Sequence, residues 1–363
     1  MGARVLVRGA GIVGLAVADA LVSAGHDVTV VDRAPGSGAS YAAAGMLSPS
    51  SEVWYGEEAL LDLGLRSLAL WPAFAAGLGV PLHTRGTLLV GHDRGDLQQV
   101  ERQVELLAGR GRAVDLLTSH EVRRCEPTLG RVSGGAVLPD DQAVDPRAVV
   151  SALRERLGSR VVPRVLDGPA DVEVVATGSR LPAPWAHLVR GVRGEILRVR
   201  TDDPPAHVVR GWVRGDPAYV VPRTPGGGGP VEVVVGATSE EHDGPPVATV
   251  GGVARLLEAA RTLLPGLDRA ELVEVTARDR PATADHLPIV GPAPVDDNTR
   301  PVVLAAGHFR HGVLLAPLTA ALVVAHLASG AVDPALDPRR AALRGPAPTP
   351  DPTPDPTDEE THR

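Results

Sequence analysis

The chain has 363 residues, 44% of them hydrophobic and 22% charged, which suffices for one composite unit or two domains. Its net charge of −8 argues against a nucleic-acid partner, because such a partner requires a basic face. The sequence has no lysine and one cysteine, Cys125. It therefore excludes Schiff-base lysines, Walker-type phosphate loops, intrachain disulfides and cysteine-based metal clusters. We expect a cytoplasmic protein with no metal site.

The first 33 residues predict a strand, a glycine turn, a helix and a second strand. Strand-like residues 4–9 precede helical spacing over residues 12–24, and a second strand over residues 26–31 is expected to lie parallel to the first. Arg8 is the odd member of the first strand, since that position is normally apolar.

The glycine turn predicts a dinucleotide site. Gly9, Gly11 and Gly14 have the G-x-G-x-x-G spacing, which lets backbone amides at a helix N-terminus approach a pyrophosphate. Asp32 follows at the distance expected of a carboxylate that accepts hydrogen bonds from a ribose. The acidic residue disfavours NADP, but the motif alone does not separate FAD from NAD.

The remaining elements alternate between helical and strand patterns. We expect helices ending at Trp71 and over residues 96–110, 118–124, 144–158 and 250–267, and strands over residues 171–179, 193–200, 218–223, 231–239 and 302–307. Residues 312–330 approach the length of a membrane span, but Pro317, Thr319 and His326 interrupt them, so we expect a buried helix and no membrane.

Six further segments carry a resemblance to a known family. They are SYAAAGML (40–47), RGEIL (193–197), AYVVPR (218–223), VVVGATSEEHDG (233–244), RPATADHLPIVG (280–291) and AGHFRHGVLLAP (306–317). Together they resemble the glycine oxidases of thiamine biosynthesis, within the wider D-amino-acid oxidase and sarcosine oxidase group. The segments occur in order over nearly the whole chain before its tail.

The resemblance implies an α/β fold, an α+β composite. A discontinuous Rossmann-like FAD-binding domain of GR2 type (residues 1–80, 140–190 and 280–340) is expected to carry an inserted mixed or antiparallel-sheet substrate domain (residues 81–139 and 191–279). Residues 341–363 are rich in Pro, Thr and acidic residues, and we expect a disordered tail there.

The resemblance also implies a non-covalent FAD site. Its expected contacts, besides Gly9, Gly11 and Gly14, come from Ile12, Val13, Asp32, Arg33, Ala39, Ser40, Ala44, Gly45, Met46, Val165, Gly178, His308, Phe309, Arg310, His311, Gly312, Val313 and Leu314. The histidines are expected to pack beside the flavin ring rather than transfer protons.

On the substrate side, the resemblance implies that Arg280 clamps a carboxylate, that Tyr219 hydrogen-bonds it and that Arg310 reaches it from the flavin side. A planar bidentate donor such as arginine suits that task. Glu52 is a candidate at the entrance, although a solvated carboxylate at a helix start is an equal interpretation. Ser239 falls where the family commonly has a larger apolar residue, which would widen the choice of substrate.

The implied reaction is oxidation of glycine to an imine, then to glyoxylate and ammonia, with oxygen reduced to hydrogen peroxide. Hydride transfer to flavin N5 requires no catalytic side chain, and the product would serve the thiazole branch of thiamine biosynthesis. Alternatives are a sarcosine or D-amino-acid oxidase or dehydrogenase, a non-catalytic flavin-binding subunit, or an NAD-dependent dehydrogenase. The family implies a homo-oligomer, usually a tetramer.

Overall fold

The computed structural model describes residues 2–164, 170–224, 229–294 and 300–343. Its β-strands are β1 Arg4–Arg8, β2 Asp27–Val31, β3 Met46–Leu47, β4 Leu82–His83, β5 Thr87–Gly91, β6 Leu116–Thr118, β7 Gly134–Leu138, β8 Gln142–Val144, β9 Val161–Val162, β10 Val172–Val175, β11 Arg190–Thr201, β12 Val208–Val213, β13 Asp216–Pro222, β14 Val231–Gly236, β15 Glu271–Ala282, β16 Ile289–Pro292 and β17 Val302–Ala306. Its α-helices are α1 Ile12–Ser23, α2 Ala39–Ala42, α3 Glu58–Leu68, α4 Trp71–Leu78, α5 Arg94–Gly109, α6 Ser119–Cys125, α7 Pro146–Leu157, α8 Val250–Leu263, α9 Ala316–Ser329 and α10 Pro338–Leu343.

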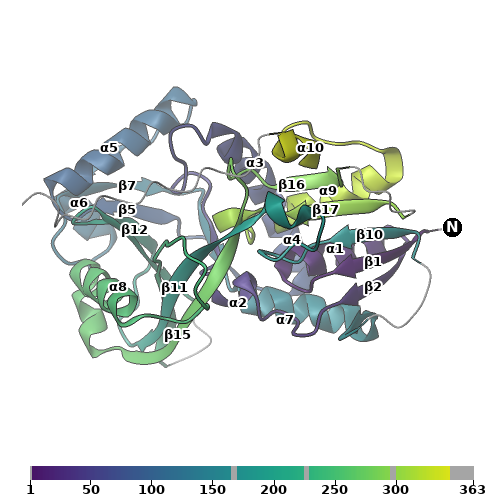
Figure 1. Cartoon of the computed structure of the whole chain (residues 1–363). Helices are drawn as coiled ribbons and strands as arrows, with labels where there is room; N and C mark the ends of the chain where they lie inside the picture. The colour runs from purple at the N-terminus through teal and green to yellow at the C-terminus, as the bar shows by residue number, and fades with distance from the viewer. Residues whose placement is uncertain (1, 165–169, 225–228, 295–299, 344–363) are drawn as a thin grey trace, which may run out of the picture.

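One half of the molecule is built on a six-stranded sheet in the order β16-β17-β10-β1-β2-β9. Its neighbours are parallel except for β16 and β17, and the predicted parallel pairing of β1 with β2 is confirmed. Helices α1, α7 and α9 pack beside this sheet, and their apolar side chains share one core with its strands (Figure 1). The central strands are therefore buried, which explains their continuous runs of Val and Leu.

The other half contains an eight-stranded sheet in the order β15-β11-β14-β13-β12-β5-β7-β6, antiparallel except where β5 meets β12. Helices α5 and α8 lie at opposite ends of this half in Figure 1. The long strands β11 and β15 run from it toward the six-stranded sheet. At the end of β15, Ala282 forms an isolated antiparallel β-bridge with His308, in the turn after β17.

The expected helix ending at Trp71 is wrong in its extent, because two helices, α3 and α4, occupy this region. Pro72 stands in the first turn of α4 and has no backbone N–H with which to continue α3. No single helix in the described ranges has the length and apolarity to cross a membrane; α3 and α4 meet that test only together, across a 45° bend.

Two other expectations concern the C-terminal part of the chain. The predicted buried helix within residues 312–330 is confirmed as α9, whose inner face packs in the core. Residues 341–343, which we assigned to the tail, instead form the end of α10. The rest of the expected tail lies outside the described residues.

Candidate functional site

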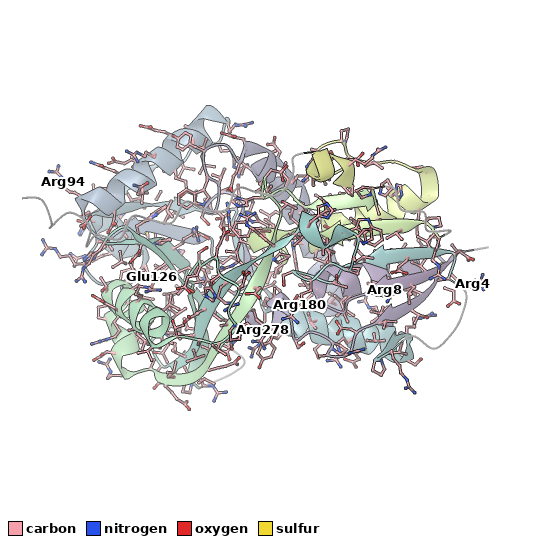
Figure 2. The ribbon with its side chains drawn as sticks, in the orientation of Figure 1. Arg4, Arg8, Arg94, Glu126, Arg180 and Arg278 are labelled. Atoms are coloured by element: carbon pink, nitrogen blue, oxygen red, sulfur yellow. The ribbon has the colours of Figure 1, made fainter. Side chains whose placement is uncertain are left out.

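A large cavity of about 1010 Å³ lies where the two halves meet. The parallel strands β1, β2, β10 and β17 all end at one edge of their sheet, so the turns that follow them form one wall. A face of the eight-stranded sheet forms the opposite wall. Arg8, Arg180 and Arg278, which all line the cavity, are labelled in Figure 2, where Arg180 and Arg278 lie near the junction.

The glycine turn forms one end of the cavity. Gly9 has φ +101°, and a Cβ there would lie 2.3 Å from the carbonyl oxygen of Ala176. Gly14 lies so close to Gly9 that a Cβ would sit 2.0 Å from its carbonyl oxygen. Both positions therefore require glycine, which lets the first turn of α1 reach the cavity edge.

Asp32 holds this turn in place. Its carboxylate accepts hydrogen bonds from the backbone N–H of Ala10 and of Ala34, both at 2.8 Å, and the residue lines the cavity. The Ser40 hydroxyl accepts a hydrogen bond of 3.0 Å from the Ile12 N–H at the start of α1. Arg8, the unexpected charge in β1, pairs with Glu173 on the adjacent strand β10, so the structure gives it a partner.

The opposite wall carries Arg280 and Tyr219, each lying over a glycine. Arg280 pairs in register with Val192, and its guanidinium lies over Gly194, two residues farther along β11. Tyr219 pairs in register with Gly236, and its ring covers that glycine. A Cβ would stand 2.5 Å from the Arg280 Cζ or 2.3 Å from the Tyr219 hydroxyl, so both side chains occupy space that only glycine leaves open.

Arg210, Arg280 and Arg310 are three of the guanidinium groups that line this half of the cavity, and they differ in their partners. Arg280 donates to two carbonyl oxygens, that of Thr238 at 3.1 Å and that of Arg193 at 3.3 Å. In the described part of the chain no carboxylate lies within ion-pair distance of Arg280, whereas Arg210 pairs with Glu52 and Arg310 pairs with Glu57. Of these three, Arg280 is therefore best placed to take an external carboxylate.

The Arg310 guanidinium is already bound within the protein. It donates to both carboxylate oxygens of Glu57 and, at 3.0 Å, to the carbonyl oxygen of Glu52. Burial would raise the pKa of Glu57, but hydrogen bonds from His286 and Arg310 outweigh it and lower that pKa to about 2. Glu57 is thus ionised at neutral pH and neutralises Arg310.

Comparison with known proteins identifies the family of the chain. Residues 4–326 match the model of the family described as FAD dependent oxidoreductase. The chain belongs to the FAD dependent oxidoreductase family. A Rhizobium etli protein with the provisional name thiamine biosynthesis oxidoreductase is 35% identical to this oxidoreductase over 346 residues, covering 89% of this chain and 96% of the relative. The glycine oxidase of Geobacillus kaustophilus is 30% identical over 354 residues, which cover 88% of this chain and 91% of the relative. A crystal structure of glycine oxidase from the same organism superimposes with a TM-score of 0.78 at 29% identity. The superposition covers 92% of this chain and 96% of that chain.

The residues of this FAD dependent oxidoreductase fit its cofactor, FAD. The glycine turn, the first turn of α1 and Asp32 would hold the pyrophosphate and the ribose, because all three meet at the same end of the cavity. Gly312 and Val313, in the turn before α9, lie in the part of the wall joined to β15 through His308, where the flavin ring would lie. The cavity runs without interruption from the glycine turn to Gly312 and Val313, as an extended dinucleotide requires.

Most residues that the sequence singled out line this cavity: Gly9, Gly11, Ile12, Val13, Asp32, Arg33, Ala39, Ser40, Ala44, Gly45, Met46, Glu52, Gly178, Tyr219, Ser239, Arg280, His308, Phe309, Arg310, Gly312 and Val313. Three do not. Gly14 lies behind the turn against Gly9, His311 is buried beside Glu52, and Leu314 is a core residue whose carbonyl oxygen binds two side chains of the α3–α4 region. Val165 lies outside the described residues.

The two histidines of the flavin-side turn are neutral at physiological pH. Burial lowers the pKa of His308 to about 4, and its Nε2 forms a hydrogen bond of 2.9 Å with the Thr319 hydroxyl. Burial and the nearby Arg310 hold the pKa of His311 well below its ordinary value. Neither imidazole is poised to exchange a proton near pH 7. Of the two, only His308 lines the cavity, so its packing beside the flavin ring stays a prediction, and His311 lies behind the wall.

Sequence reasoning missed Arg210 and Trp54. Arg210 lies in β12, a strand that the sequence analysis did not predict, and it pairs in register with Tyr219. Trp54 lines the cavity while packing edge-to-face on Trp212, with ring centroids 6.2 Å apart. One signal was available for Arg210, since a single arginine inside the apolar run VVRGWV requires a buried partner.

Proposed function

We propose that this protein oxidises a small amino acid, with glycine as its principal substrate, to the imine and then to glyoxylate and ammonia. Bound FAD would accept the two electrons that the substrate loses and pass them to oxygen, which yields hydrogen peroxide. The observation that carries the proposal is the Arg280 guanidinium, which faces a cavity shared with the FAD residues and lacks a carboxylate partner among the described residues.

The protein's own side chains would bind and orient the substrate. Arg280 takes the carboxylate, and Tyr219 adds a hydroxyl donor beside it. Burial raises the pKa of Tyr219, so the hydroxyl keeps its proton. Two directional contacts fix the Cα of a small substrate relative to the flavin. Once the bound amine has lost its ammonium proton, the α-hydrogen leaves as hydride, so no side chain has to remove that hydrogen as a proton.

Ser239 supports a substrate range somewhat wider than glycine. Its small side chain lines the cavity, and we propose that it accommodates a substrate slightly larger than glycine. Sarcosine and D-alanine are therefore the next candidates. The name of the Rhizobium etli relative supports a place in thiamine biosynthesis, for which we propose the thiazole branch. We also propose a cytoplasmic homo-oligomer, a tetramer by family resemblance.

We also propose that the two sheets mark the two domains. The six-stranded sheet draws its strands from residues 4–31, 161–175 and 289–306, and the eight-stranded sheet from residues 87–138 and 190–282. The cavity then lies between an FAD-binding domain and a substrate domain.

The direct test is the visible spectrum of the purified protein before and after anaerobic addition of glycine. We expect a yellow protein whose flavin bleaches, and peroxide release once air is admitted. Bleaching without peroxide release on admitting air would indicate a dehydrogenase. A flavin that bleaches only with sarcosine or D-alanine moves the substrate to those amines, and a flavin that no amino acid bleaches contradicts the proposal.

A further inference from the structure

The cavity wall contains a buried carboxylate, that of Glu52, which is only 6% exposed. The nearest side chains to its two oxygens are the guanidinium of Arg210, with Nη1 3.5 Å from Oε1, and the neutral imidazole of His311, with Nδ1 3.7 Å from Oε2. Among the described residues no N–H or O–H group donates a hydrogen bond to either oxygen. An ionised carboxylate in such a place requires a donor, because burial without one is costly.

The backbone that carries Glu52 is fixed from several directions. The carboxylate of Asp141 accepts hydrogen bonds from the N–H of Ser50 and of Ser51. Arg210 donates from Nε to the Ser51 carbonyl oxygen at 2.9 Å, and Arg310 donates to the Glu52 carbonyl oxygen. The backbone at Glu52 is therefore fixed in the wall, and its buried side chain extends from a rigid support.

Glu52, Tyr219 and Arg280 line the same cavity, and Arg210, whose Nη1 lies 3.5 Å from the Glu52 carboxylate, pairs in register with Tyr219. The charges of Arg280, Glu52, Arg210 and Arg223 all act on the Tyr219 hydroxyl. Arg280 supplies positive charge without a carboxylate partner, and Glu52 supplies negative charge without a hydrogen-bond donor. A pocket with one group of each charge suits a small molecule that carries a carboxylate and an ammonium group on the same carbon atom.

We propose that Glu52 binds the ammonium group of the substrate while Arg280 binds its carboxylate, so that the pocket selects small zwitterions over simple carboxylates. Arg210, in β12, is a positioning residue, since it donates a hydrogen bond to the Ser51 carbonyl oxygen and forms an ion pair with the Glu52 carboxylate. This inference rests on the proposed function and assigns a role to each charge of the substrate.

The test compares glycine with acetate, which has the carboxylate and lacks the amine. Dissociation constants are measured anaerobically on the FAD-loaded protein, from the spectral shift of the flavin or from the concentration dependence of its reduction. We expect Glu52→Gln to raise the dissociation constant of glycine about 10- to 100-fold, the cost of a charged hydrogen bond, while that of acetate changes less than about 3-fold. Glu105→Gln, on the exposed face of α5, is the matched control and is expected to change neither.

An equal loss of both ligands, or an unchanged affinity for glycine, would overturn the inference. If Glu52→Gln does not retain FAD, the same measurement on Glu52→Asp replaces it. The shorter acid keeps the negative charge but reaches less far, so we expect it to prefer glycine over acetate by a smaller ratio than the wild type does. Arg210→Lys is expected to weaken glycine more than acetate, and an equal effect on both contradicts its positioning role.

The two proposals fail separately. If the wild-type protein binds glycine but its flavin is not reduced, the proposed reaction is refuted. The dissociation constants of glycine and acetate in the wild type and in Glu52→Gln still test the role of Glu52. A wild-type protein that binds acetate but none of glycine, sarcosine and D-alanine refutes the zwitterion site itself.

Discussion

Replacing Gly194 by alanine tests the carboxylate site by adding a single methyl group. The new Cβ would lie 2.5 Å from the Cζ of Arg280 and 2.5 Å from each of its terminal nitrogens. Carbon atoms pack at about 3.5 Å or more, so the guanidinium must move by roughly 1 Å. That movement breaks hydrogen bonds that now measure 3.1 and 3.3 Å. A misplacement of this size costs about 100-fold in kcat/KM, or about 2.7 kcal/mol.

The same substitution should leave the fold intact. The three atoms nearest to the new methyl group all belong to the far end of the flexible Arg280 side chain, so we expect the free energy of unfolding to change by less than about 1 kcal/mol. The assay is peroxide release against glycine concentration, with FAD content measured in the same preparation. Gly251→Ala in α8 is the control, since its methyl group would meet Arg255 at an ordinary 3.7 Å.

Kinetics within about 3-fold of the wild type would refute this reasoning, because a displaced guanidinium cannot hold the carboxylate in the same place. Loss of FAD together with activity would also contradict it, since the argument confines the damage to the substrate side.

Three other predictions follow from the site. Arg280→Ala should raise the KM for glycine about 100- to 1000-fold with FAD retained, and unchanged steady-state kinetics would remove Arg280 from the site. Asp32→Ala leaves two backbone N–H groups of the glycine turn without an acceptor, so FAD should dissociate about 10- to 100-fold more readily. Full flavin occupancy after gel filtration would count against that role. Burial raises the pKa of Asp141 to about 7, whereas the unfolded chain has about 3.9. The stability that this group contributes is therefore complete below about pH 4 and is lost as the pH rises through 7. Between pH 5 and pH 8, urea unfolding should show the wild type losing about 3 kcal/mol more than Asp141→Asn, and parallel losses would contradict the assignment.

The sequence was most informative where the local structure depends on residues that are close together in the chain. The first strand, the glycine turn and α1 were predicted because a positive φ at Gly9 and the apolar spacing of α1 are local properties. Strand β12 was missed because Arg210 and Gly211 interrupt its apolar alternation, and only a partner from another segment makes that arginine acceptable in a strand. The break between α3 and α4 was also readable in principle from Pro72.

The sequence by itself determined that a dinucleotide site opens the chain and, through resemblance, which residue types serve the substrate. Only the tertiary structure decided how the charges are shared. Arg310 is neutralised by Glu57, Arg280 has no carboxylate partner among the described residues, and Arg210 supports Glu52. The reason is physical: these pairs join segments far apart in the chain, and strand register and the packing of the two halves set their distances.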